Sequence, residues 1–343
     1  MSKFATATYL FVHYAVVTSY MASGGEYVAL FVSKLVPSPE FFSLPPSLSP
    51  MVYGAATFAP MLLLPEKTMA AINNLLVLAA LASFLAIISF GLPTVDTAIL
   101  QLPETLPPLS TVAPPIPVFL LTLVFHNVIP TVSRLLDYDP KAIRSAISLG
   151  SVVPFLLFLL YNFTILGNVG VVADLGAAAA SSLDPIAILQ SRAGDNPLLP
   201  TLVEGFCLLA ITTSLVGFVE GLKTIYNPMF SGESGIFPAA VVENKERAIA
   251  VAIAVPPVAA ACYDPGISLP ALEFGALYGV TSLFLVIPAL MASKVRKSGD
   301  FRSSVGAEVD GEYEGRLIPW TGGVELAGLL GVAGIAIASS FVR

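Results

Sequence analysis

Long apolar stretches alternate with short polar ones along this chain. Met69–Leu92 and Ser145–Ala173 contain no charged side chain. Each run is longer than the ~20 residues that a helix, rising ~1.5 Å per residue, needs to cross a hydrocarbon layer ~30 Å thick. The pattern therefore predicts membrane-spanning helices and not the half-polar helices of a soluble domain.

Apolar runs, turn residues and charges together predict a single polytopic domain, residues 1–343, with about nine transmembrane helices. The second of these, at ~15 residues, is short for a full crossing. The expected spans lie near residues 6–36, 50–64, 68–92, 112–136, 142–168, 199–229, 247–263, 269–293 and 321–342.

The composition supports this class and argues against several others. Hydrophobic residues make up 56% of the chain and charged residues only 11%, with a mean hydropathy of +0.84. A soluble domain carries charge on roughly a quarter of its residues. The net charge of −7 argues against nucleic-acid binding, which needs a basic surface. Because Cys207 and Cys262 are single residues within apolar runs, we expect neither a metal site nor a cofactor.

The distribution of lysine and arginine tests the span count and orients the chain. With the N-terminus on the inner side, all basic residues fall in inner loops or at inner helix ends except Lys34, Arg192 and Arg343. Basic residues in short loops are retained on the inner side of a membrane. A missed or invented span would destroy this alternation, so we expect the N-terminus inside and the C-terminus outside.

The fourth expected span carries the most unusual polar group in the chain. His126, Asn127 and Pro130 lie close to the middle of the membrane. Pro130 lacks an N–H and crowds the preceding turn, so a helix is kinked or opened there. The segment is either a broken helix that lines a ligand site, or a proline kink whose histidine hydrogen-bonds a neighbouring helix.

Motifs in and around this span point to a family. The most specific are FHNVIP at 125–130, DPKAIRSAI at 139–147 and YNFTILGN at 161–168. Further matches lie at residues 19–25, 212–217, 256–257, 263–265 and 288–291. In this order they resemble the tyrosine/tryptophan-specific permease family, the aromatic amino acid permeases, which belong to the amino acid/polyamine/organocation type of transporter.

The resemblance implies an all-α integral membrane protein with the LeuT-type inverted-repeat transporter fold, in which each repeat opens with a broken helix. By the matched motifs, the chain begins at the third span of the family. We therefore expect an N-terminally truncated member that lacks the first two family spans. Either the sequence is an incomplete gene model, or the protein is naturally shorter.

The resemblance also implies a substrate site at the fourth span. The opened backbone of Phe125, His126, Asn127 and Val128 would hold the substrate ammonium through free carbonyls. His126 either handles substrate or a proton, since imidazole titrates in the physiological range, or makes a structural hydrogen bond. Tyr20 in the first span is a further substrate-facing candidate.

Coupling to an ion is expected in the sixth span. Thr212, Thr213 and Ser214 place hydroxyls at mid-membrane, where they either bind a cation or bond back to their own helix. Glu204, toward the outer side, is a candidate proton relay. Further along the span, Glu220 lies one turn before Lys223, and the two are expected to pair.

Two pairs of glycines are expected to serve helix packing. Gly24 and Gly25 in the first span let a helix or a ligand approach the backbone, and packing is the plainer interpretation. Gly217 and Gly221 in the sixth span form a small-xxx-small pair, which is typical of close helix contact.

The favoured function is secondary active transport of an aromatic amino acid, tyrosine or tryptophan, across a lipid bilayer by symport with a proton (or sodium). The alternative is a truncated, non-transporting member that acts as a membrane scaffold or regulator. An enzyme is not expected, because the only histidines are His13 and His126 and no HExxH, GxSxG or paired-aspartate motif occurs. The membrane is either the plasma membrane or a chloroplast envelope.

Overall fold

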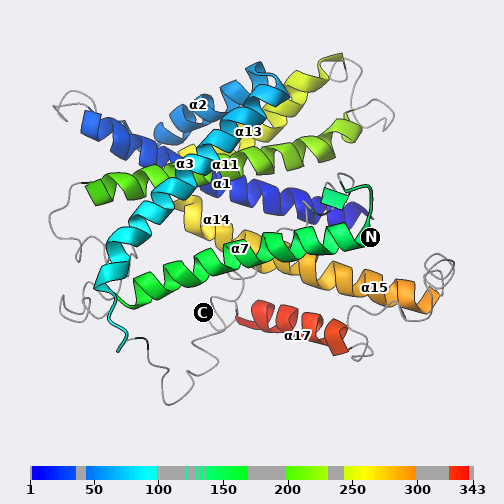
Figure 1. The fold of residues 1–343 in the computed structure, drawn as a ribbon. Helices are drawn as coiled ribbons and strands as arrows, with labels where there is room; N and C mark the ends of the chain where they lie inside the picture. The colour runs from blue at the N-terminus through cyan, green and yellow to red at the C-terminus, as the bar shows by residue number, and fades with distance from the viewer. Residues whose placement is uncertain are drawn as a thin grey trace.

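Helices form the regular structure of this protein (Figure 1). The computed structural model describes residues 2–35, 44–98, 100, 121–122, 129, 132–133, 136–168, 198–230, 243–298 and 324–339. No β-strand occurs in these ranges, which is consistent with the predicted all-α class. The LeuT-type arrangement and the number of spans stay predictions.

The helices are separated by short turns and by stretches outside the described residues. The separate helices are α1 (Ser2–Leu35), α2 (Ser49–Leu63), α3 (Glu66–Gly91), α7 (Pro140–Leu166), α11 (Leu198–Met229), α13 (Lys245–Tyr263) and α17 (Val324–Ser339). The 3-10 turn η1 (Leu92–Thr94) extends α3. Four helical segments follow one another without a break: the turn η3 (Pro265–Ile267), α14 (Ser268–Phe274), η4 (Gly275–Val286) and α15 (Ile287–Ser298). Among these segments, η4 has the wider π-helical form.

Prolines and aspartates set several helix ends. Pro65 separates α2 from α3, because the residue before a proline disfavours the helical conformation. At the start of α7, the Asp139 carboxylate accepts a hydrogen bond from the Lys141 backbone N–H at 2.9 Å. Asp264 caps η3 in the same way, accepting from the Gly266 N–H at 3.0 Å. The Asp264 cap thus lies between the end of α13 and the turn that leads into α14.

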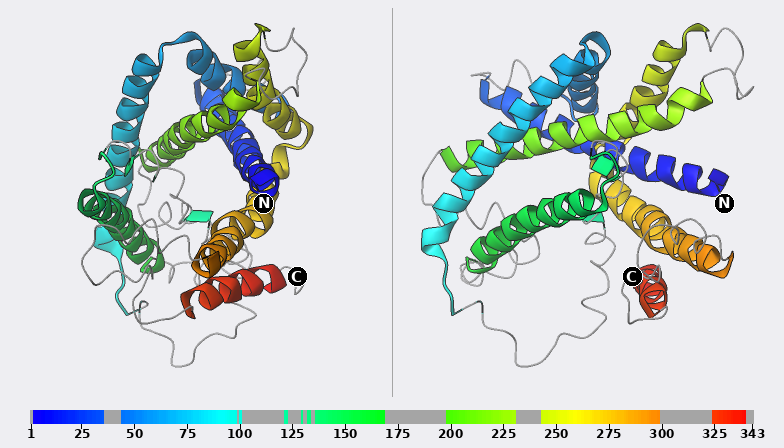
Figure 2. Two further views of the ribbon diagram at one scale, coloured as in Figure 1. Left: turned by 90° about the vertical axis from the view of Figure 1, so that its right-hand side faces the viewer. Right: turned by 45° about the vertical axis from the view of Figure 1, so that its right-hand side comes forward.

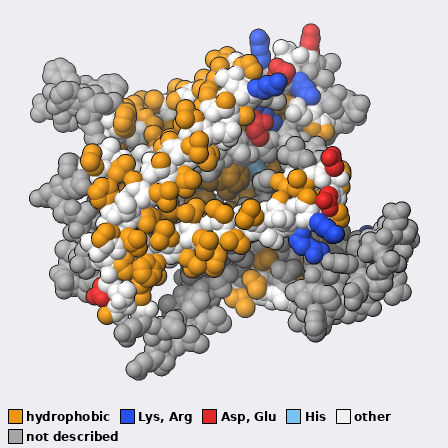
Figure 3. All heavy atoms as spheres, in the orientation of Figure 1, with side chains coloured by type: hydrophobic (Ala, Val, Ile, Leu, Met, Phe, Trp, Pro, Cys, Tyr) orange, Lys and Arg blue, Asp and Glu red, His pale blue; other side chains and the backbone are white. Residues whose placement is uncertain are grey.

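Five helical stretches of the described chain are long and apolar enough to cross a membrane: Lys67–Thr94, Pro140–Leu166, Thr201–Met229, Lys245–Tyr263 and Pro265–Met291. Large apolar side chains such as those of Leu149, Phe155 and Phe158 on α7 are exposed. Hydrophobic side chains also cover much of the face seen in Figure 3. Such a surface is suited to lipid and not to water. The chain is an integral membrane protein.

α1 is the helix that most of the others contact. It packs against α2, α11, α13, α14 and η4. Its polar side chains Thr8, His13, Thr18 and Ser19 are buried in these contacts. These residues lower the average hydropathy of α1, which explains why this 34-residue helix is not among the five apolar stretches. Polar residues are tolerated at membrane depth where they face protein instead of lipid.

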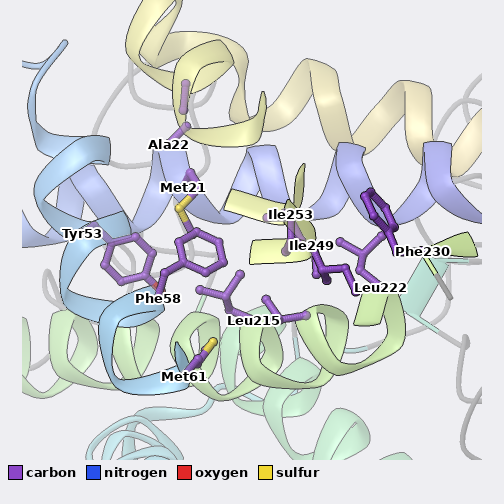
Figure 4. Close-up of a cluster of buried hydrophobic side chains, with 13 residues drawn as sticks. Met21, Ala22, Tyr53, Phe58, Met61, Leu215, Leu222, Phe230, Ile249 and Ile253 are labelled. Carbon is purple, nitrogen blue, oxygen red and sulfur yellow. The ribbon is translucent and has the colours of Figure 1, made fainter. Parts of the chain in front are cut away.

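A hydrophobic core joins α1, α2, α11 and α13 (Figure 4). Its fully buried members include Met21 of α1, Tyr53 of α2, Leu215 and Leu222 of α11, and Ile253 of α13. On the side of the bundle away from α2 and α13, α17 lies beside η4 and α15 (Figure 2). The core therefore fixes α1 against the helices that carry the polar residues described below.

A tyrosine fills the gap that a proline opens in α13. Pro256 has no N–H, so the carbonyl of Ala252, four residues earlier, loses its usual helical partner. The Tyr14 hydroxyl of α1 donates to that carbonyl at 2.5 Å and lies 2.7 Å from the Tyr226 hydroxyl of α11. Because the Tyr14 proton is already used, Tyr226 is the donor in the second bond. Two hydroxyls thus tie three helices together.

Tyr14→Phe is expected to destabilise the protein more than Tyr226→Phe. The first change leaves the Ala252 carbonyl without a donor, at a cost of about 1–3 kcal/mol, whereas the second removes a single bond worth about 0.5–1.5 kcal/mol. Denaturation of the purified variants in mixed micelles measures both free energies of unfolding. Equal stabilities would contradict the assigned donor and acceptor roles.

Candidate functional site

Hydroxyl side chains from three helices meet beside the core. We call them the hydroxyl cluster: Tyr20 of α1, Tyr53 of α2, and Thr212 and Ser214 of α11. The Tyr53 Oη lies 3.1 Å from Thr212 Oγ1, and the Tyr20 hydroxyl lies near Ser214. The Phe218 ring meets the Tyr20 ring edge-on, with 5.8 Å between centroids. The cluster thus combines hydrogen-bonding groups with an aromatic wall.

The hydrogen bonds of the cluster have a definite direction. Thr212 donates its single proton to the Leu208 carbonyl of its own helix at 2.7 Å, so Tyr53 must donate to Thr212. Ser214 is the exposed member of the cluster. Hydroxyl oxygens also suit a monovalent cation, whereas no group of three or more His, Cys, Asp or Glu side chains in the described ranges could hold a metal ion.

Two glycines allow α2 to approach α1 at this point. A Cβ on Gly24 would overlap the Tyr53 ring, and a Cβ on Gly25 would lie 2.6 Å from the Pro50 backbone nitrogen. Neither position has room for a side chain, which confirms that both glycines serve packing. The close contact places Tyr53 across from Thr212.

His13 lies about two turns along α1 from Tyr20 and touches the same Phe218 ring. Its imidazole stacks on Tyr9 with 3.8 Å between ring centroids and meets Phe218 edge-on at 5.1 Å. The Nδ1 atom is 2.9 Å from the Tyr9 carbonyl oxygen. Since a carbonyl can only accept, Nδ1 carries the proton in this bond. Phe218 therefore stands between His13 and the hydroxyl cluster.

Two partly polar cavities lie where α11 meets α2. A cavity of about 230 Å³ is bounded by α2, α11 and α13 and is lined in part by Lys223 and Glu246. A second, of about 340 Å³, is bounded by α2, α3 and α11 and is lined in part by Asn73, Glu220 and Lys223. The Lys223 Nζ lies 2.7 Å from Glu220 Oε1, which confirms the predicted pair.

Comparison with known proteins identifies the family of this helical bundle. Residues 1–305 match the sequence profile of the tryptophan/tyrosine permease family. The chain belongs to this family. Permeases are transport proteins, and the comparisons therefore point to a transport protein and not to an enzyme. No solved structure matches the chain.

Two relatives of this permease family member come from Haemophilus influenzae. Tyrosine-specific transport system 1 is 24% identical over 219 residues, which is 64% of this chain and 52% of the relative. Tyrosine-specific transport system 2 is 22% identical over 299 residues, which is 85% of this chain and 69% of the relative. The chain thus spans about half the length of the first relative and about two thirds of the second.

The structure brings some of the predicted permease site residues together. Tyr20, Thr212 and Ser214 meet in the hydroxyl cluster. The Thr213 hydroxyl instead donates to the Ala210 carbonyl of its own helix at 3.1 Å. Glu204 lies roughly 12 Å along the α11 axis from Thr212 and is also apart from the cluster. Phe125, His126, Asn127 and Val128 lie outside the described residues, so their roles stay predictions.

Sequence reasoning missed two residues of this region. Tyr53 lies in no recognisable motif, and its only signal was the Gly24–Gly25 pair, which allows another helix to approach α1 closely at this point. His13 was detectable, because an ionisable residue within an apolar span is a functional signal by itself. Both assignments need the pairing of α1 with α2 and α11, which the sequence does not contain.

The predicted glycine pair of α11 is only half correct. A Cβ on Gly221 would lie 2.8 Å from the His13 Nε2 atom, which confirms a close contact with α1. A Cβ on Gly217 would meet nothing within 4 Å among the described residues, so no close contact is found there. Helical spacing predicted that Gly217 and Gly221 lie on the same face of α11. α1 comes close to that face at Gly221 and not at Gly217.

Gly25→Ala is expected to lower the stability of the protein, whereas Gly217→Ala is not. The methyl group at position 25 must push α2 away from α1, and overpacking of this kind costs about 1–3 kcal/mol. At position 217 the methyl group has space, and alanine is the better helix former. Thermal unfolding of both variants in detergent measures the difference, and a Gly25→Ala variant as stable as the parent would contradict the described contact.

Proposed function

We propose that this permease family member carries out secondary active transport of an aromatic amino acid, tyrosine or tryptophan, across a lipid bilayer. The observation that carries the proposal is the hydroxyl cluster with its aromatic wall, placed among apolar helices. Membership of the family and the two tyrosine-specific relatives support the same substrate class.

The cluster suits the side-chain end of such a substrate. The exposed Ser214 hydroxyl can exchange a hydrogen bond with a phenol hydroxyl or accept one from an indole N–H. The edge-to-face rings of Tyr20 and Phe218 offer an aromatic surface for the substrate ring. The charged ends of the amino acid would then be held by the opened backbone proposed for Phe125 to Val128.

The proposed driving force is symport of a proton, with sodium as the alternative ion. Accumulation against a gradient requires a second solute that moves downhill with the first. Thr212 and Ser214 supply neutral oxygens of the kind that bind a monovalent cation, and Glu204 on the same helix is the proposed relay for a proton.

The N-terminus is proposed to lie on the inner side of the membrane, because Lys3 and most other basic residues then face inward. Tyr263, which is 93% exposed at the end of α13, would face outward. In a background without Cys207 and Cys262, Tyr263→Cys is expected to react with an impermeant thiol reagent added to intact bacterial cells. Lys3→Cys should react only after permeabilisation, and the reverse pattern would contradict the orientation.

Uptake by the purified protein in proteoliposomes tests the function. An inward proton gradient of about one pH unit is expected to drive roughly tenfold accumulation of tyrosine or tryptophan if one proton moves with each substrate molecule. A sodium gradient applied at equal pH distinguishes the coupling ion. A protein that shows neither accumulation nor exchange of labelled substrate would reject transport and favour the membrane scaffold or regulator.

Neighbouring hydroxyls provide a matched pair of variants for this assay. Ser214→Ala removes the exposed hydroxyl of the cluster, and the loss of one hydrogen bond is expected to raise KM about five- to tenfold. Thr213→Ala removes a hydroxyl that is bonded to its own helix, and KM should change by less than about twofold. If both variants change KM equally, the hydroxyl cluster is not part of the substrate site.

A further inference from the structure

We propose that the Nε2 atom of His13 binds and releases the proton that drives transport. This inference rests on the transport function proposed above and assigns its coupling to one atom. During each cycle Nε2 would gain a proton from water on one side of the membrane and lose it on the other. The Nδ1 proton would stay in place throughout.

The His13 imidazole is buried with one nitrogen unused. His13 is only 3% exposed. Its Nδ1 proton is committed to the Tyr9 carbonyl oxygen at 2.9 Å, so the lone pair of the neutral ring resides on Nε2. That atom is buried and has no hydrogen-bond partner in the described structure. The side chain therefore presents a proton acceptor that nothing in the described structure occupies.

Burying Nε2 without a partner costs free energy. A buried acceptor without a partner costs about 1–3 kcal/mol. A phenylalanine at this position would stack on Tyr9 and touch Phe218 without that cost, since both contacts involve only the ring. If the ring only served packing, an unpaired nitrogen would not be needed. A side chain that must bind a proton does need an unpaired nitrogen.

Nε2 packs closely against α11 at Gly221. A Cβ on Gly221 of α11 would lie 2.8 Å from His13 Nε2 and 2.8 Å from the Tyr9 hydroxyl oxygen. Both polar atoms therefore lie against the backbone of α11 at Gly221, where no side chain separates them from the helix. The Tyr9 hydroxyl is the neighbouring group that can pass a proton to Nε2 or hydrogen-bond it after small side-chain movements.

The helices packed against α1 carry other ionisable groups. Glu220 pairs with Lys223, Tyr226 with Tyr14, and Tyr53 with Thr212. Glu246 lines a cavity, Tyr278 stacks on Phe274, and Glu204 and Glu273 each have an interaction of their own. None of these described groups is hydrogen-bonded to His13 Nε2. An imidazolium at position 13 would thus lack a paired carboxylate in this conformation. Because a buried charge without a partner costs several kcal/mol, His13 is neutral here.

Protonation therefore requires α1 and α11 to separate near Gly221. Such a movement would expose Nε2 and would also displace Phe218, which touches His13 on one side and Tyr20 of the hydroxyl cluster on the other. Proton uptake and access to the hydroxyl cluster would then be linked through one aromatic ring. This arrangement meets the requirement that both ligands bias one conformational equilibrium.

His13→Gln in proteoliposomes tests the proposal, because glutamine keeps an amide donor but cannot titrate. In the parent protein a gradient of about one pH unit should give roughly tenfold accumulation of tyrosine. In His13→Gln the accumulation ratio should fall to about one, while exchange of labelled for unlabelled tyrosine at equal pH stays within about threefold of the parent. A variant that still accumulates tyrosine would overturn the role of His13, whereas a parent without accumulation or exchange would overturn the transport function itself.

Nitrogen NMR of the parent chain in bilayers decides the case in which His13→Gln also loses exchange. The chain has only two histidines, so the signals that persist in His126→Gln belong to His13. The expected result is a neutral ring protonated on Nδ1 that gains a second proton over the pH interval in which exchange changes its rate. A ring protonated on Nε2, or one that does not titrate between about pH 5 and 8, would overturn the proposal.

Discussion

Within the apolar layer of a membrane there is no water to hydrogen-bond a bare peptide or side-chain group, so each such group must find its partner in the protein. The Tyr14 hydroxyl supplies such a partner by donating to the Ala252 carbonyl, which Pro256 cannot hydrogen-bond. Asn168 supplies partners between α3 and α7. Its amide nitrogen donates to the Gly91 carbonyl at 3.1 Å, and its oxygen accepts from the Thr94 hydroxyl at 2.8 Å. These bonds fix helices in register. Among the described residues, the buried side-chain N and O atoms without a hydrogen-bond partner are His13 Nε2 and Asn73 Oδ1, so an unpaired atom is informative.

The central position of α1 follows from the same constraint. A helix with buried Thr, Ser and His side chains is poorly suited to lipid, and it is stable when other helices enclose it. Small residues make this enclosure close: Gly24 and Gly25 admit α2, and Gly275 of η4 comes so near that a Cβ there would lie 2.8 Å from Ala15 Cβ. The polar residues of α1 are thus held at fixed distances from α11, where the hydroxyl cluster forms.

The sequence predicted what depends on averages and on local chemistry. Membrane character follows from long apolar runs, and the Glu220–Lys223 pair follows from spacing within one helix. Contacts between distant segments could not be predicted from the sequence. Tyr53 and Thr212 are far apart in the chain and meet because α2 and α11 both pack against α1. For the same reason the sequence could not predict that Thr212 and Ser214 lie beside Tyr53 and Tyr20, whereas the Thr213 hydroxyl donates to the Ala210 carbonyl of its own helix.

The two cavities beside α11 have a common boundary, since Met61 and Lys223 line both of them. Both side chains are long and unbranched, but Met61 belongs to the buried core and Lys223 is paired with Glu220 at 2.7 Å. The boundary between the two cavities is therefore held by one packing contact and one ion pair. A change of shape in either cavity at this boundary requires one of these two contacts to break.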